Sequence, residues 1–133
     1  MFFESFLTIV KIMKLKLYTP QEVEVWYLIP SVKKEFVRAL IESNLKQNEI
    51  AKILGLTDAA VSQYMHNKRA ANMELPKEVA LEIEISAKKL LSKETQFNQE
   101  LQRIMRIIHE KQYICNPCRT HTGASNDCKM CYL

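Results

Sequence analysis

Glycine is scarce in this sequence of 133 residues, with only Gly55 and Gly123 present, and there are just four prolines. Leu, Ile, Lys and Glu are plentiful by comparison. Because such a composition favours helix, the sequence predicts an all-α fold. Hydrophobic residues make up 47% of the chain, which is enough for one compact core with an appendage.

Cysteine is absent from the first 114 residues, which leaves no disulfide framework for the body of the protein. The last 19 residues hold two Cys-x-x-Cys pairs: Cys115, Cys118, Cys128 and Cys131. Two such pairs in an otherwise cysteine-free basic chain indicate a metal site in a reducing compartment.

Long apolar runs are also missing. The stretch from Met1 to Met13 is interrupted by Glu4 and Lys11 and is too short to cross a bilayer. It lacks the basic start and the small-residue cleavage site of a signal peptide. We therefore expect a cytoplasmic protein with no membrane partner, and an N-terminal extension over 1–18 in which Met13 is an alternative start.

Helix signals follow one another along the chain. Thr19, Pro20 and Glu22 predict a capped helix start, and this helix should run to about Leu28. Pro30 should interrupt it and begin a second helix. Apolar spacing predicts the further helices, whereas the residues from Tyr113 onward lack periodicity and are rich in turn formers. The expected helices after Pro30 cover 31–43, 46–54, 57–67, 76–91 and 93–112, with a connection over 70–75.

The segment 47–66 has the pattern of two short helices that cross at a tight turn. Ala51 is the small residue that a close crossing needs, and Gly55 supplies the positive φ of the turn. Thr57 is placed to cap the second helix, whereas Lys46 stands where Ser or Thr would cap the first. The pair would be locked by Ile50, Leu54, Leu56 and Val61. This predicts a helix-turn-helix; an ordinary amphipathic helix pair is the alternative.

The outer side of the second helix offers short polar side chains that can enter the major groove of DNA. Gln63 can pair with adenine, Ser62 with several base edges, and Ala59 with a thymine methyl group. The start of the first helix and the residues after the second should contact phosphate. A net charge of +4 suits a polyanion but is common in soluble proteins. The predicted DNA-binding residues are Gln47, Asn48, Thr57, Asp58, Ala59, Ser62, Gln63, His66, Lys68 and Arg69.

The phrase Ala59-Ala60-Val61-Ser62-Gln63-Tyr64, followed by Lys68-Arg69, resembles the recognition-helix signature of the Xre-type, or lambda-repressor-like, helix-turn-helix family. With the stretch from Glu24 to Pro30 upstream and the cysteines at the end, the chain is similar to a group of predicted archaeal regulators. The resemblance spans 20–133 and is strongest over 32–69. It implies a five-helix DNA-binding domain that is usually dimeric. Those proteins carry a cysteine near the position of Gln21, where this chain departs.

Three kinds of site compete for the cysteine tail. A disulfide is disfavoured in the cytosol, structural zinc is the commonest use of two Cys-x-x-Cys pairs, and an iron–sulfur cluster also takes four cysteines. Pro117 has no N–H to donate to the first thiolate of a zinc knuckle, and Arg119 and Tyr132 replace the glycines that usually follow. These departures and the archaeal resemblance favour a [4Fe-4S] cluster, with zinc as the alternative.

Four other side chains are candidates for ligand binding. His121 lies between the cysteine pairs and could replace a thiolate, but with four cysteines available we expect a loop residue. We expect His109 on a helix surface, and Trp26 and Tyr27 in the core or in a dimer contact.

The sequence thus predicts four parts: an extension over 1–18, a DNA-binding domain over 19–91, a linking or dimerisation helix over 92–112, and a four-cysteine tail over 113–133. The long helix should pack on the core or on a partner subunit. The predicted function is a homodimeric regulator of transcription that binds double-stranded DNA, with an iron–sulfur cluster that senses redox or metabolic state. The alternatives are a DNA-binding regulator with structural zinc and a thiol redox protein. We expect no enzyme, because no strand-rich thioredoxin pattern surrounds the cysteines.

Overall fold

The computed structural model describes residues 19–66 and 73–132. Within these ranges the regular secondary structure is entirely helical, with no strand, which confirms the all-α prediction. None of the helices in these ranges is long and apolar enough to cross a membrane. The elements are α2 (Pro20–Val23), the π-helical turn η1 (Glu24–Leu28), α3 (Ile29–Glu42), α4 (Gln47–Leu54), α5 (Asp58–Met65), α6 (Lys77–Leu91), α7 (Phe97–Glu110), α8 (Cys115–Thr122) and the 3-10 turn η2 (Met130–Tyr132).

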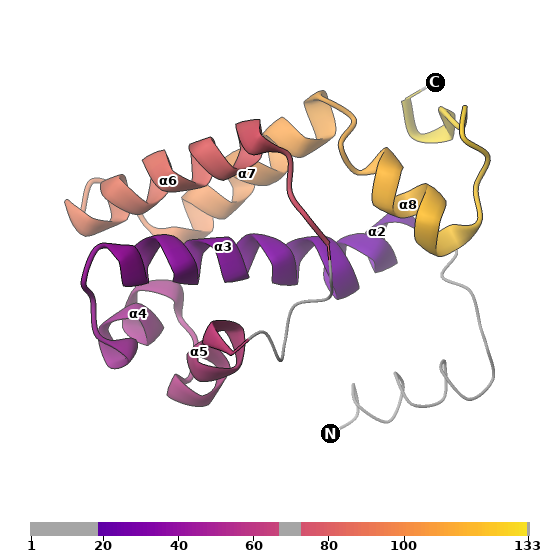
Figure 1. Ribbon diagram of the computed structural model, residues 1–133. Helices are drawn as coiled ribbons and strands as arrows, with labels where there is room; N and C mark the ends of the chain where they lie inside the picture. Colours follow the sequence, from indigo (N-terminus) through magenta and orange to yellow (C-terminus); the bar gives the residue numbers. More distant parts are fainter. Residues whose placement is uncertain (1–18, 67–72, 133) are drawn as a thin grey trace.

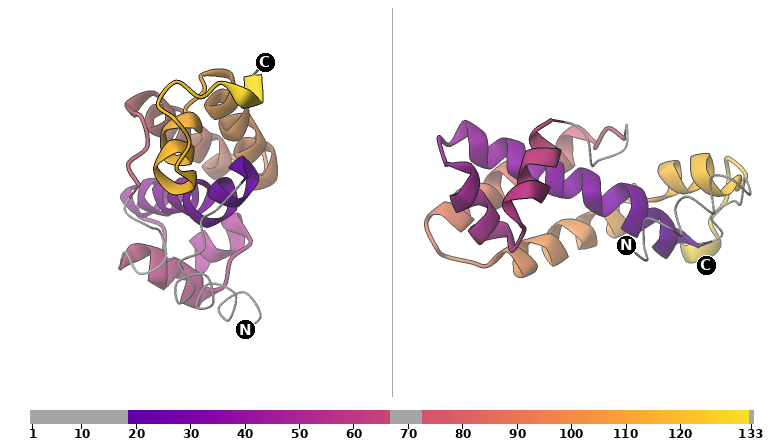
Figure 2. Two further views of the ribbon diagram at one scale, coloured as in Figure 1. Left: turned by 90° about the vertical axis from the view of Figure 1, so that its right-hand side faces the viewer. Right: turned by 90° about the horizontal axis from the view of Figure 1, so that it is seen from below.

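The molecule is built around one long central helix formed by α2, η1 and α3 (Figure 1). The pair α4–α5 packs on one side of α3, and the antiparallel pair α6–α7 covers the other (Figures 1 and 2). Helix α8 packs against α2 at the opposite end of the central helix from α4. The central helix has 23 residues and is therefore about 34 Å long, so it separates the cysteine tail from the α4–α5 pair.

A single hydrophobic core runs from Val23 to Ile114 and includes residues of every helix from α2 to α7. Its centre holds Phe36 of α3, whose ring meets the ring of Phe97 of α7 edge-on with centroids 5.2 Å apart. Ile104 and Ile108 of α7 are completely buried in the same core. Helix α7 therefore packs on the core, which is one of the two places that the sequence indicated for it.

The predicted break at Pro30 is wrong, because the helix continues through this residue. The chain widens into a π turn over Glu24–Leu28, in which the N–H of Ile29 bonds to the carbonyl of Glu24 five residues earlier. A proline inside a regular α-helix clashes with the carbonyl of the fourth preceding residue. The wider turn in front of Pro30 relieves this crowding, and the buried Val32 and Phe36 hold α3 in place beyond it.

Two further boundaries differ from the sequence prediction. Helix α7 begins at Phe97 instead of about Lys93, because Lys93 is in the left-handed region (φ 59°) and Gln96 and Gln99 form a capping box. The tail was expected to lack regular structure, but α8 occupies its first part. Pro117 falls in the first turn of α8, where a helix needs no N–H from it, and Gly123 ends the helix at φ +75°.

A buried polar network fastens α6 to α7. The carboxylate of Glu100, 5% exposed, accepts hydrogen bonds from the hydroxyls of Ser86 (2.6 Å) and Thr95 (3.0 Å) and from Nε of Arg103 (3.2 Å). Arg103 also pairs with Glu82 at 2.6 Å. Burial alone would raise the pKa of Glu100, but these hydrogen bonds and the positive charge of Arg103 hold it below its usual value.

Candidate functional site

Helices α4 and α5 are joined by a tight turn that follows the sequence signals closely. Gly55 caps α4 in the left-handed conformation (φ +65°), and the N–H of Leu56 bonds to the carbonyl of Ala51 at 2.9 Å. Thr57 then caps α5, with its hydroxyl accepting the N–H of Ala60 at 3.0 Å. Both roles were predicted from the residue types. The turn thereby fixes the direction in which α5 leaves α4.

A side chain also ties the two helices together at their first residues. Nε2 of Gln47 donates a 2.7 Å hydrogen bond to the carbonyl oxygen of Asp58. Lys46 is the N-cap of α4 and makes no side-chain capping bond. The sequence prediction assigned Gln47 to phosphate contact and did not reveal this intramolecular bond, since glutamine at a helix start carries no signal of a partner eleven residues away.

Helix α5 has an inner face and an outer face. Ala60, Val61 and Tyr64 are buried against the rest of the protein. Outside this buried set Ser62 is half-buried, and the exposed residues are Thr57, Asp58, Ala59, Gln63, Met65 and His66. Asn48 is exposed at the start of α4. Polar side chains that could reach a ligand therefore cover one continuous side of the pair; Lys68 and Arg69 lie outside the described residues.

The described part of the α4–α5 pair carries no excess of positive charge. From Lys46 to His66 it holds the cations Lys46 and Lys52 and the anions Glu49 and Asp58, with histidine neutral. A polyanion bound here would therefore be held by backbone dipoles at helix starts, by polar side chains and by cations elsewhere in the chain.

The second candidate site is the tail, where all four cysteines line one small cavity of about 20 Å³. Cys115 and Cys118 come from the first turn of α8, Cys128 from the segment before η2, and Cys131 from η2 itself. Partial desolvation raises the pKa of the Cys131 thiol, and the negative charges of the other three cysteines raise it further. The four cysteines share this one cavity, and all four are free thiols.

Arg119 lies beside the cysteines and links the two pairs. Its Nη2 donates to the carbonyl oxygen of Cys128 at 3.3 Å, which holds the second pair against α8. Its Nε is buried and has no hydrogen-bond partner. A buried N–H without an acceptor costs about 1–3 kcal/mol, so the arrangement fits an additional acceptor, such as a metal-bound thiolate, at this place.

The side chains that line this cavity are not arranged as the ligands of a metal ion. Within the described residues no group of three or more His, Cys, Asp or Glu side chains is close enough to hold a metal ion. The donor set itself suits zinc or an iron–sulfur cluster, since both bind four cysteine thiolates. Binding would require the cysteine side chains to turn toward one centre.

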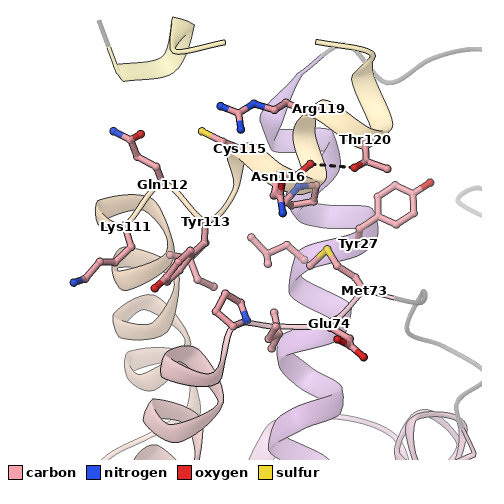
Figure 3. A pocket seen from close by; sticks show the side chains of 15 residues that line it. Tyr27, Met73, Glu74, Lys111, Gln112, Tyr113, Cys115, Asn116, Arg119 and Thr120 are labelled. Atoms are coloured by element: carbon pink, nitrogen blue, oxygen red, sulfur yellow. Dashed lines mark hydrogen bonds between the residues drawn. The ribbon is translucent and has the colours of Figure 1, made fainter. Parts of the chain in front are cut away.

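A larger cavity of about 710 Å³ lies next to the cysteine site (Figure 3). Its walls are η1, the segment Met73–Pro76, the end of α7 and the tail from Tyr113 to Thr120. Figure 3 shows Tyr113 on the α7 side of the cavity and Tyr27 with Met73 on the side of the central helix. Cys115 and Arg119 line both cavities. Sequence reasoning missed this cavity, because its walls come from three segments that are distant along the chain, 27–28, 73–76 and 108–120.

The remaining candidate side chains have structural contacts. His109 is exposed on α7, as predicted, and its Nε2 pairs with the carboxylate of Glu24 in η1. Trp26 and Tyr27 are half-buried and pack against the core, one of the two predicted locations. The side chain of His121 lies outside the described part of the structure.

Comparison of the chain with protein-family models, with curated proteins and with solved structures finds no match. The resemblance to Xre-type regulators therefore rests on the residues named above and stays a prediction.

Proposed function

We propose that this protein is a DNA-binding regulator of transcription, with α4 and α5 as a helix-turn-helix and α5 as the recognition helix. The observation that carries the proposal is the division of α5 into two faces. Ala60, Val61 and Tyr64 fasten it to the core, while Asp58, Ala59, Gln63 and His66 are exposed on its other side. An α-helix presented in this way can enter the major groove.

Individual residues have distinct expected roles in this proposal. Gln63 and Ser62 would contact base edges, and Ala59 would meet a thymine methyl group. The N–H groups at the starts of α4 and α5, near Asn48 and Thr57, would face phosphate. Lys68 and Arg69 would add the positive charge that the described part of the pair lacks.

The test begins by selecting preferred sites from random double-stranded DNA. Gln63→Ala should weaken binding to the selected site by about 1–3 kcal/mol and change binding to random DNA little. Gln102→Ala, which changes an exposed glutamine on α7, is the matched control and should leave both affinities unchanged. Equal losses on both DNAs would show that Gln63 does not read bases, and absence of any DNA binding would refute the function.

We further propose that the tail binds a [4Fe-4S] cluster through Cys115, Cys118, Cys128 and Cys131. Four cysteines around one cavity and the unpartnered Nε of Arg119 support a thiolate-bound, negatively charged centre. When bound, such a cluster would supply sensitivity to oxidation. Pro117, which cannot donate an N–H to a thiolate, favours the cluster over a zinc knuckle.

Structural zinc is the alternative, and one observation favours it. The cavity of about 20 Å³ has room for roughly one water-sized particle, so a single ion fits with less rearrangement than a cluster of four irons. Anaerobic purification followed by metal and sulfide analysis separates the two. Iron, sulfide and absorption near ~400 nm indicate the cluster, and one zinc per chain without colour indicates zinc.

We also propose that the protein forms a homodimer through the outer face of α6. Leu81 and Ile85 lie one helical turn apart there and are 59% and 46% exposed. In an antiparallel pairing centred at the level of Ile83, Leu81 would meet the partner's Ile85. The same pairing brings Glu78 near Lys88 of the other copy, although it also places Lys77 opposite Lys89. The exposed apolar pair of Leu81 and Ile85 therefore carries this proposal.

A further inference from the structure

The cavity between the tail and the central helix has the dimensions of a small-molecule site. Its volume of about 710 Å³ falls within the range of roughly 300–1,000 Å³ that is typical of ligand pockets. It also borders two departures from regular backbone, the π turn at Tyr27 and Leu28 and the left-handed residue Gln112 (φ 57°). Irregular turns of this kind are frequent at functional sites.

One part of the cavity wall is apolar, and polar side chains make up much of the rest. Leu28 and Ile108 are buried residues of the core at its base, and Leu75, Pro76 and Pro117 complete it. Tyr113 contributes an aromatic ring, and its hydroxyl is held by Glu78 at 2.7 Å. The hydrogen bond fixes the ring in position at the wall. Such a surface favours a molecule with an apolar or aromatic body.

The charges around the cavity favour one anionic group on that molecule. Two cations, Lys111 and Arg119, line it against one anion, Glu74. Lys111 lies at the rim (Figure 3), and its Nζ is 3.7 Å from Glu78, which is too long for a hydrogen bond. Lys111 can therefore turn to a bound anion without losing a strong partner.

We propose that this cavity binds a small amphipathic anion that has an apolar or aromatic body and one acidic group. The bound molecule would contact the tail on one side and Met73–Pro76 on the other. Met73–Pro76 leads directly into α6, so the molecule would join the cysteine tail to the start of this helix. Binding itself does not depend on the DNA-binding proposal.

Two probes with the same aromatic body test the proposal by titration calorimetry on the full chain. 8-Anilinonaphthalene-1-sulfonate carries one negative charge, whereas N-phenyl-1-naphthylamine has none. We expect saturable binding of one sulfonate per chain and weaker binding of the neutral probe. Lys111→Gln should weaken sulfonate binding about threefold to fivefold, as expected for an exposed ion pair, and leave the neutral probe unaffected.

A variant that fills the cavity provides the decisive comparison. Thr120 is exposed on α8 and lines the cavity, and its hydroxyl donates to the carbonyl of Asn116 within its own helix. Thr120→Trp should abolish binding of both probes, while Gln102→Trp, which adds the same side chain on an exposed face of α7, should not. Circular dichroism verifies that both variants remain folded. Unsaturable binding, or equal binding by both folded tryptophan variants, would overturn the proposal.

Discussion

Gln47 and Asp58, the first residues of α4 and α5, are joined by a 2.7 Å hydrogen bond from the side-chain amide to the backbone carbonyl. Together with the turn at Gly55 and the cap at Thr57, this bond closes a loop that fixes one helix start against the other. The angle between α4 and α5 therefore depends on the side-chain amide of Gln47 in addition to the apolar contacts.

Gln47→Glu should destabilise the protein, because a carboxylate at pH 7 cannot donate to the Asp58 carbonyl. The expected loss is about 0.5–1.5 kcal/mol in the free energy of unfolding, measured by urea denaturation. Asn48→Asp is the matched control, since it makes the same amide-to-acid change at the exposed neighbouring position. Equal stability of the two variants would show that the hydrogen bond contributes nothing.

Glu100 should make the stability of the protein depend on pH in the acidic range. Its pKa is lowered in the folded protein, so its stabilising effect is present above the unfolded pKa of about 4.3 and is lost as the pH falls through the lower folded value. Glu100→Gln should cost about 1.5–3 kcal/mol at pH 7, and the difference from the parent should shrink below about pH 4.

Denaturation curves between pH 3 and pH 7 check this prediction. Glu94→Gln, at an exposed position in the turn before α7, is the control and should show a smaller effect across the range. A difference between parent and Glu100→Gln that stayed constant down to pH 3 would contradict the lowered pKa.

The sequence was a good guide wherever a local rule decides the backbone. Thr19, Thr57 and Gly55 occupy the capping and turn positions that their residue types predict, because their hydrogen bonds and allowed φ values are local properties. The sequence was a poor guide at Pro30, where the buried residues of α3 outweigh the local penalty and the chain widens into a π turn.

The candidate sites were also predictable only in part, because local patterns identify residues but not how distant segments pack. The outer face of α5 followed from helical periodicity, and the four cysteines followed from their spacing. Helix α8 was not predicted, because the residues that anchor its start in the core, Ile114 and Cys115, are neighbours in sequence and form no periodic stripe. The positions of Arg119 and of the larger cavity depend on how distant segments pack, which no local pattern of residues encodes.

Leu81→Lys should weaken the proposed dimer. It places a charge in the centre of the apolar contact, opposite the partner's Ile85, and the dimer dissociation constant should rise about tenfold or more, equivalent to ~1.4 kcal/mol. Sedimentation equilibrium measures this change. Val25→Lys is the matched control, because Val25 is 50% exposed on η1 and lies outside the proposed interface. If the Val25 variant dissociated to the same extent, the assignment of the interface to α6 would be wrong.

The last prediction concerns coupling between the tail and DNA, and the structure suggests the route. Ile114 is buried, α8 packs on α2, and α2 belongs to the same long helix as α3, which contacts both α4 and α5. Cys118→Ser should weaken metal binding and so loosen the packing of α8. Affinity for the selected DNA site should then change by about 1–3 kcal/mol.

The core extends to Ile114, so retention of the fold has to be verified through α7 by hydrogen exchange. Thr120→Ser, a change of one methyl group on the same helix, is the control. The comparison uses metal-loaded protein, metal-free protein and the Cys118 variant, with dimerisation measured in parallel. Identical DNA affinities in all three, with α7 still protected, would show that the tail does not regulate DNA binding.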